Sequence, residues 1–197
     1  MSSASPEIKV CVIGDTDVGK SSLSKRYIDG KMPDNSTPTI GASFLQKRVK
    51  VGAVEVSLQI WDTAGQERFR SMAPMYYKQA KAAVCVFDVT NEESFHRISS
   101  WLKDLKQHAD PNVVICIAGN KCDKGATFDL EECKKFAESN EAKFFPTSAL
   151  TGEGVEALFT ELSEKIVESY NLKDMTMPTD DLAIDLTKNK SAKRGCC

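Results

Sequence analysis

The segment Gly14-Asp-Thr-Asp-Val-Gly19-Lys20-Ser21 matches the pattern G-x-x-x-x-G-K-[ST]. It follows an apolar run that ends at Ile13 and precedes helical spacing over residues 22–28, which is the setting that phosphate binding requires. The glycines let the backbone wrap around phosphates, while amide N–H groups and the helix N-terminus supply positive potential. Lys20 is expected to reach the β- and γ-phosphates, and the Ser21 hydroxyl to coordinate Mg²⁺. The remaining predicted nucleotide-binding residues of this loop are Asp15, Thr16, Asp17, Val18, Gly19 and Ser22.

A second group of residues, Trp61-Asp-Thr-Ala-Gly-Gln-Glu67, follows another apolar run. Asp62 closes that strand, so its carboxylate should emerge at the sheet edge where ligands bind. An aspartate at such a place is often only a helix cap. Here a glycine follows, Gly65, whose amide can approach a γ-phosphate, and then Gln66, which can orient a water by donating and accepting hydrogen bonds. The group therefore predicts a metal ligand, a phosphate contact and a catalytic glutamine.

The third group is Asn120-Lys121-Cys122-Asp123, which comes directly after the apolar run 113–119. A carboxylate there can accept hydrogen bonds from both N1–H and the 2-amino group of guanine. Adenine lacks that pair of donors, so such a site rejects ATP. After the last strand come Ser148, Ala149 and Leu150, where a backbone amide can meet the guanine O6. Together, four groups at the carboxyl ends of successive strands predict a guanine nucleotide site.

The elements that must position these groups alternate along the chain. Short apolar runs predict strands at residues 8–13, 43–49, 53–60, 82–88, 113–119 and 143–146. Between them, helical spacing is found at 22–28, 71–80, 95–105, 130–138 and 155–170. This order predicts an α/β fold with a mostly parallel six-stranded sheet and helices on both faces.

Composition agrees with one globular domain. The chain has 197 residues, 41% of them apolar and 27% charged, with a formal net charge of -2. That charge argues against binding nucleic acid by general phosphate attraction. No apolar run approaches the roughly 20 residues of a membrane span, and no secretory signal is visible, so we expect a soluble intracellular protein. Residues 7–170 are predicted to form the domain, and residues 171–197, poor in large apolar groups, a flexible tail.

The chain resembles the Rab family of small GTPases, within the Ras superfamily. The resemblance rests on the motifs above together with Thr39-Ile-Gly-Ala-Ser-Phe44, the segment 61–70, Met75-Tyr-Tyr77 and the final Cys196-Cys197. Segments 40–44, 73–77 and 90–95 resemble the early-endosomal branch of that family more closely. It implies the fold of P-loop NTPases and a GTP-binding switch that hydrolyses GTP slowly and recruits effectors in vesicle traffic.

The resemblance also implies roles for individual residues. Thr39 would bind Mg²⁺ through its hydroxyl and sense the γ-phosphate through its amide. Phe44, Trp61 and Tyr76 would form an aromatic patch that effectors read, since exposed aromatic rings are good binding anchors. A plainer interpretation, that Trp61 and Phe44 merely pack the hairpin, stays open at this point. The implied partners are an exchange factor, a GTPase-activating protein, a GDP-dissociation inhibitor and effectors, with the protein itself monomeric.

Among the departures from the family pattern, two bear directly on nucleotide binding; Ser36 and Leu150 also differ from the residues usual in Ras itself. Asp17 stands where a glycine or another small residue is usual, and an acid near phosphates is electrostatically unfavourable. Met32 stands where an aromatic ring usually packs against guanine. No arginine finger is evident within the chain, so intrinsic hydrolysis should be on the order of 10⁻⁴ to 10⁻³ per second, and an activating partner should supply the missing arginine.

The end of the chain resembles the doubly geranylgeranylated terminus of Rab proteins. Two prenyl chains, on Cys196 and Cys197, would anchor the protein stably to a membrane, whereas one chain would hold it only marginally. Nearby basic residues would add attraction to anionic lipid. We therefore expect the protein on the cytoplasmic face of endosomal or vesicle membranes, cycling with the cytosol.

Two alternative functions remain at the level of sequence. A metabolic P-loop ATPase or kinase is disfavoured by Asn120 and Asp123 and by the lack of a lid or acceptor domain. A nucleotide-binding module with little or no hydrolysis is disfavoured by Gln66, whereas Asp17 and Met32 keep it open.

Overall fold

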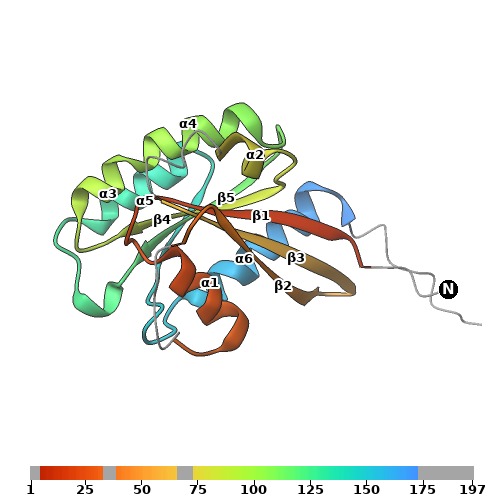
Figure 1. The fold of residues 1–197 in the computed structure, drawn as a ribbon, viewed down its shortest axis with the longest axis horizontal. Coiled ribbons are helices and arrows are strands. Elements are labelled where there is room, and N and C mark those ends of the chain that lie inside the picture. The colour runs from red at the N-terminus through yellow and green to blue at the C-terminus, as the bar shows by residue number, and fades with distance from the viewer. Residues whose placement is uncertain (1–4, 33–38, 66–72, 173–197) are drawn as a thin grey trace, which may run out of the picture.

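A six-stranded sheet lies between two layers of helices in the computed structural model, which describes residues 5–32, 39–65 and 73–172 (Figure 1). The strand order is β2-β3-β1-β4-β5-β6. β2 runs antiparallel to β3, and the other neighbouring strands are parallel. The prediction of an α/β fold with a mostly parallel sheet is therefore confirmed. The elements are β1 (Glu7–Ile13), α1 (Lys20–Asp29), β2 (Ala42–Val51), β3 (Val54–Thr63), α2 (Ala73–Tyr77), β4 (Ala82–Asp88), α3 (Glu92–His96), α4 (Ile98–His108), β5 (Val114–Asn120), the short 3₁₀ helix η2 (Cys122–Lys124), α5 (Leu130–Ser139), β6 (Lys143–Pro146) and α6 (Val155–Ser169).

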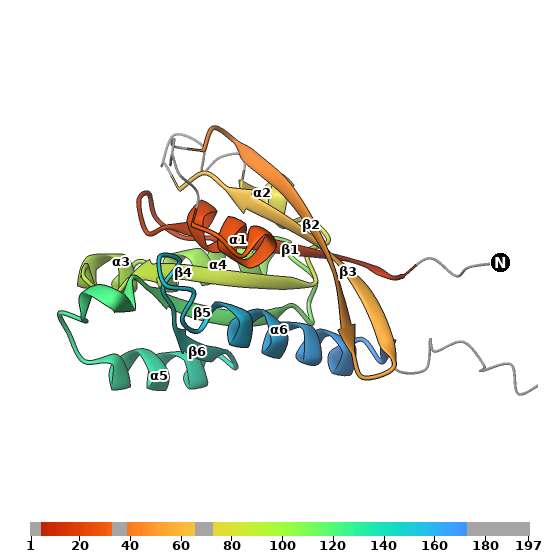
Figure 2. The same ribbon diagram turned by 90° about the horizontal axis from the view of Figure 1, so that it is seen from below.

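The two faces of the sheet carry separate apolar cores. α1 and α6 cover one face, where Tyr27 stacks on Phe159 with ring centroids 3.9 Å apart. α2, α3, α4 and α5 cover the other, around Phe87 and Leu105 (Figure 1). Every residue of β4 and β5 is buried, which explains why these strands read as unbroken apolar runs. Figure 2 shows the β2–β3 hairpin extending beside α6.

The carboxyl ends of the parallel strands meet at one edge of the sheet. β1 leads there into the phosphate loop, and β4 and β5 end side by side because Asp88 pairs in register with Asn120. Asp62 lies one residue before the end of β3, opposite Val12 of β1. Ligands of open α/β sheets bind at this edge, so the fold brings the sequence motifs together there.

Two helical predictions needed correction. The apolar spacing over residues 95–105 suggested one helix, but α3 and α4 are separate and meet at Arg97. Serine hydroxyls compete for the backbone carbonyls at this point, because Ser99 donates to the His96 carbonyl and Ser100 to the Arg97 carbonyl. The expected amphipathic stretch over 71–80 contains only the five-residue α2 among its described residues, and Gln79 beyond it has a left-handed φ of 63°.

No helix among the described ranges is long and apolar enough to cross a membrane. Cys11, Cys85, Cys116 and Cys133 are buried free thiols in the core, and Cys122 is partly exposed.

Candidate nucleotide-binding site

The phosphate loop between β1 and α1 is packed tightly against neighbouring strand ends. Gly14 has a φ of 139°, and a Cβ on it would lie 2.1 Å from the Val86 carbonyl oxygen. Gly19, with a φ of 92°, caps the N-terminus of α1, and its Cβ would lie 2.3 Å from Asn120 Nδ2. Only glycine fits either place, so the two motif glycines are explained by packing and backbone conformation together. The loop leaves the N–H groups of α1 available to an anion.

Lys20 is buried within this loop, with 6% of its surface exposed. Its Nζ donates a hydrogen bond to the Asp15 carbonyl at 2.6 Å. Burial lowers the pKa of Lys20 to about 8, although the charges of Asp62, Asp15 and Asp17 act in the opposite direction. A phosphate beside the ammonium group would stabilise its charged form, which makes this buried lysine a suitable anion ligand.

Three oxygen-bearing side chains converge next to Lys20. Ser21 Oγ lies 2.7 Å from Thr39 Oγ1, and Thr39 Oγ1 lies 3.5 Å from Asp62 Oδ2. Ser43 also donates to Asp62 Oδ2, at 3.3 Å. The other carboxylate oxygen, Oδ1, is buried without a hydrogen-bond partner in the described structure. Burial raises the pKa of Asp62, while the Ser21 hydrogen bond and the Lys20 charge oppose that rise.

This donor set fits a hard divalent cation. Hydroxyl and carboxylate oxygens are the ligands that Mg²⁺ prefers, and a bound cation would satisfy the unpaired, buried Asp62 Oδ1. The described residues include no group of three or more His, Cys, Asp or Glu placed to hold a metal. A cation site here therefore depends on the two hydroxyls, Ser21 and Thr39, as well as on Asp62.

Gly65, two residues after the end of β3, packs directly on the phosphate loop. A Cβ on Gly65 would lie 2.4 Å from the Asp15 carbonyl carbon and oxygen and 2.5 Å from Lys20 Nζ. The absence of a side chain lets this peptide approach the lysine closely. At this position, the backbone of Gly65 would be able to respond to a phosphate bound by Lys20.

The loop that follows β5 is braced against its neighbours by Asn120, which is 1% exposed. Its Nδ2 donates to the Val18 carbonyl at 2.8 Å, and its Oδ1 accepts from the Ala149 N–H at 3.2 Å. Asn120 thus ties the phosphate loop to the loop 148–150. Asp123 is joined to that same loop, because Ser148 Oγ donates to Asp123 Oδ1 at 2.5 Å.

Lys121 links the base-side loop to the tip of the phosphate loop. Its Nζ donates to the Asp17 carbonyl at 2.7 Å and pairs with Asp88 Oδ2 at 2.6 Å. Burial of Asp88 disfavours its ionised form, but hydrogen bonds from Lys121 and Thr90 outweigh this and hold the pKa of Asp88 below its ordinary value. The side chain of Lys121 therefore lies across the rim of the site between two fixed oxygen acceptors.

The remaining predicted residues lie around the same rim. Thr16 and Asp17 are exposed at the tip of the phosphate loop, and Asp17 has a left-handed φ of 63°. Ser22 is buried on α1 directly after Ser21. Leu150 is 58% exposed at the edge of the base-side loop.

An aromatic cluster lies on β2, β3 and α2. Phe44 contacts Trp61 edge to face with centroids 5.5 Å apart, and Trp61 lies 6.3 Å from Tyr76. Phe44 is 49% exposed, and the neighbouring Ile40 and Met75 are 80% and 68% exposed. The hydroxyl of Tyr76 would lie 3.4 Å from a Cβ on Gly41, two residues after Thr39. The three rings are thus packed together beside a predicted switch loop. Phe44 is accessible there, whereas Trp61 and Tyr76 are partly buried against the core.

Comparison with known proteins settles the family. Residues 9–168 match the model of the Ras family. The chain is 43% identical over 194 residues to the human Ras-related protein Rab-22A, covering 97% of this chain and 98% of that protein. It is 48% identical over 162 residues to the Ras-related protein Rab-31 of Rattus norvegicus, covering 81% and 83% of the two chains. The chain belongs to the Ras family.

The Rab relatives place this GTPase in the Rab branch, as the motifs suggested. It is a GTP-binding switch that hydrolyses GTP to GDP, and GTPases of the Ras family generally use Mg²⁺. Two groups of predicted residues lie outside the described structure: the catalytic Gln66, and the terminal Cys196 and Cys197.

The structure adds three residues that sequence patterns did not single out in this GTPase. Asp88 fixes Lys121, Ser43 donates to Asp62, and Arg26 donates to the Thr151 carbonyl at 2.7 Å. Asp88 ends an apolar strand, and Asp62 lies one residue before the end of another. An acidic residue at the carboxyl end of an apolar strand is therefore a sequence signal that could have identified Asp88 as a site residue. Arg26 is separated from Thr151 by 125 positions along the chain, and no motif in the sequence indicates that contact.

Proposed function

We propose that this Rab-type GTPase acts as a nucleotide-controlled switch on the cytoplasmic face of endosomal or vesicle membranes. The observation that carries the proposal is the convergence of Ser21, Thr39 and Asp62 beside the buried ammonium group of Lys20. Thr39 reaches this cluster from the loop before β2, and Gly65 from the segment after β3. These two segments continue toward the partly exposed aromatic cluster of Phe44, Trp61 and Tyr76, so the predicted phosphate site and that cluster are connected through them.

Ser21, Thr39 and Asp62 are proposed to hold Mg²⁺, which fits the unpaired Asp62 oxygen. When bound, Mg²⁺ would supply charge neutralisation for the phosphates. The remaining proposed nucleotide contacts come from the phosphate loop, Asp15 to Ser22, from Asn120, Lys121 and Asp123, and from Ser148, Ala149 and Leu150. Asp123 is proposed to read N1–H and the 2-amino group of guanine, with its carboxylate oriented by Ser148.

Hydrolysis transfers the γ-phosphoryl group to water. An oxygen–phosphorus bond forms from the water while the bond to the β-phosphate oxygen breaks, giving GDP and phosphate. Lys20 stabilises negative charge on the phosphate oxygens, and Gln66 is proposed to orient the attacking water. The described arginines are Arg26, which bonds Thr151, Arg97, which pairs with Asp15 and Glu93, and Arg48, which is exposed on β2 opposite Ser57 of β3. None of the three is placed as an arginine finger. We infer slow intrinsic turnover and stimulation by an arginine from a GTPase-activating protein.

The output of the switch is proposed to be the surface around Phe44, Trp61 and Tyr76. A γ-phosphate would hold Thr39 and Gly65 against the phosphate loop, and its loss would release both segments. Effectors that bind the aromatic cluster would then distinguish GTP from GDP. The further proposed partners are an exchange factor and a GDP-dissociation inhibitor, with prenyl groups on Cys196 and Cys197 as the membrane anchor. We propose that the protein is monomeric.

The proposal is tested by comparing the full chain with Gln66→Leu and Ser21→Asn variants. Single-turnover hydrolysis of GTP, with and without a GTPase-activating protein, should be slow in the wild type, stimulated by the partner, and abolished by Gln66→Leu. Imaging in cells should show the Gln66→Leu variant retained on endosomal membranes and the Ser21→Asn variant displaced from them. A wild type that binds GTP without hydrolysing it, even with activating proteins, would contradict the proposed reaction.

A further inference from the structure

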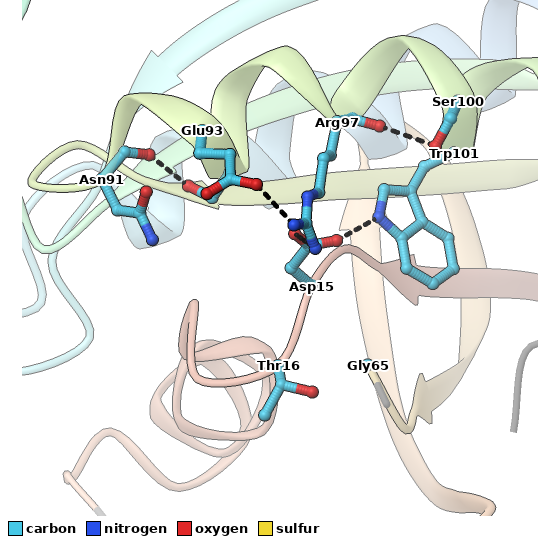
Figure 3. A pocket seen from close by; sticks show the side chains of 9 residues that line it. Asp15, Thr16, Gly65, Asn91, Glu93, Arg97, Ser100 and Trp101 are labelled. Carbon is cyan, nitrogen blue, oxygen red and sulfur yellow. Dashed lines mark hydrogen bonds and ion pairs between the residues drawn. The ribbon is translucent and has the colours of Figure 1, made fainter. Parts of the chain in front are cut away.

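Asp15 turns its carboxylate toward the start of α4, where it meets Trp101 and Arg97 (Figure 3). Trp101 Nε1 donates to Asp15 Oδ1 at 2.8 Å, and Arg97 Nη1 lies 3.3 Å from Asp15 Oδ2. A cavity of about 420 Å³ adjoins these side chains on the side of the phosphate loop that faces α3 and α4. The negative charge of Asp15 is thereby paired with the Arg97 guanidinium on the helical side of the phosphate loop.

The backbone of the same residue supports the reacting end of the site. Its carbonyl accepts the hydrogen bond from Lys20 Nζ at 2.6 Å. Its peptide also forms the surface on which Gly65 packs, since a Cβ on Gly65 would lie 2.4 Å from the Asp15 carbonyl atoms. Any rotation of the Asp15 peptide would therefore displace the Lys20 ammonium and open the contact with Gly65.

The two partners of the Asp15 carboxylate come from one side of the helical layer. Arg97 stands at the break between α3 and α4, and Trp101 follows four positions later, so both side chains face the loop. Trp101 is 4% exposed, and a buried indole N–H without an acceptor is costly, so this hydrogen bond should be well maintained. The Arg97 side chain is 54% exposed and also pairs with Glu93, so its contribution is expected to be the smaller one.

We propose that Trp101 and Arg97 are positioning residues for GTP hydrolysis. Acting through the Asp15 carboxylate, they fix the Asp15 peptide, whose carbonyl orients the Lys20 ammonium and whose backbone receives Gly65. This inference rests on the proposed function and extends it to residues that touch neither nucleotide nor metal.

Single-turnover hydrolysis at saturating GTP and Mg²⁺ tests the inference on the full chain. Trp101→Phe keeps the ring and removes the N–H donor, and it should lower the rate constant about tenfold. Asp15→Ala removes the acceptor of both Trp101 and Arg97 and should lower the rate constant at least as much. The double variant should be no slower than Asp15→Ala alone, because Trp101→Phe then breaks no further linkage. Arg97→Gln should lower the rate about twofold to threefold. Asp15→Asn keeps an acceptor for Trp101 and should restore most of the rate.

The indole ¹H–¹⁵N resonance of Trp101, assigned by its absence in Trp101→Phe, gives a second readout. It should shift in Asp15→Ala and stay close to its wild-type position in Asp15→Asn. Gln107→Ala is the matched control on α4, because the Gln107 side chain is exposed, and its rate should equal that of the wild type. Should Trp101→Phe fail to fold, as judged by thermal unfolding, Asp15→Ala carries the test.

Unchanged hydrolysis in folded Trp101→Phe and Asp15→Ala proteins would overturn the inference while leaving the proposed function intact. Failure of the wild type to hydrolyse GTP would instead count against the proposed function itself.

Discussion

Arg26 should control how tightly the base-side loop holds guanine. Its Nη2 donates to the Thr151 carbonyl at 2.7 Å, and its guanidinium group lies against Gly152, where a Cβ would be 2.6 Å from Nη2. Thr151 in turn donates its N–H to Ser148 Oγ, which donates to Asp123. Loss of one hydrogen bond from a charged donor costs about 1.5 kcal/mol at a half-exposed site, which is about tenfold in an equilibrium constant. Arg26→Gln should therefore release GDP about tenfold faster than the wild type.

The assay is dissociation of a fluorescent GDP analogue from full-length protein in excess GDP and Mg²⁺. Arg48→Gln removes another arginine, exposed on β2, and is the matched control, with an unchanged rate expected. Gly152→Ala should mimic Arg26→Gln, because the new Cβ displaces the guanidinium group and residue 152 has a φ of +90°. A GDP release rate for Arg26→Gln within about twofold of the wild-type rate would refute the reasoning, since loss of a charged hydrogen bond should accelerate release by more than that.

Three further outcomes are expected. Asp123→Asn should reverse base preference from guanosine to xanthosine nucleotides, because an amide can donate to the C2 carbonyl of xanthine; competition titrations that still favour GDP would contradict the assigned role. Asp17→Gly should slow GDP release about fivefold, since it removes an acid near the phosphates that contributes about 1 kcal/mol of repulsion, and equal dissociation rates would exclude that effect. The pKa of Lys20, about 8 without nucleotide, should rise when phosphates bind, so GDP binding at pH 9 should take up nearly one proton and weaken as the pH increases. Calorimetry in two buffers of different ionisation enthalpy measures that uptake, and identical heats would show that Lys20 does not change protonation.

The lowered pKa of Lys20 also makes the stability of the folded protein depend on pH. A folded-state pKa below the ordinary value of 10.5 means that the unfolded chain binds more protons between pH 8 and 10.5. The nucleotide-free protein should therefore gain stability from this group as the pH rises through that window. Bound nucleotide should remove the gain, because phosphate favours the charged lysine in the folded state.

The parts of this molecule that the sequence predicted are those with a local signature. Buried strands are recognisable in the sequence as apolar runs. The phosphate loop is recognisable by glycines at fixed spacing, because packing against Val86 and Asn120 admits no other residue at Gly14 and Gly19. Parallel strands then bring their carboxyl ends to one edge, so the motif residues could be placed together without knowledge of their contacts.

The contacts that escaped prediction join elements distant along the chain. Trp101 read only as part of an apolar helical face, yet its indole N–H reaches Asp15, 86 positions away. The break at Arg97 was also missed, because apolar spacing continues through it while the competing serine hydrogen bonds are local and polar. Such linkages depend on how helices dock on the sheet, which periodicity does not specify.

Nucleotide titration of the metal-free, nucleotide-depleted protein tests the central claim most directly. With Mg²⁺ present, GTP should bind at least about 10⁴-fold more tightly than ATP, since a site built to pair with guanine donors rejects a base that lacks them. Asp62→Asn should remove most of the additional affinity that Mg²⁺ confers on GTP while leaving the preference for guanine. Equal binding of GTP and ATP, or GTP binding indifferent to Mg²⁺ in the wild type, would contradict the account.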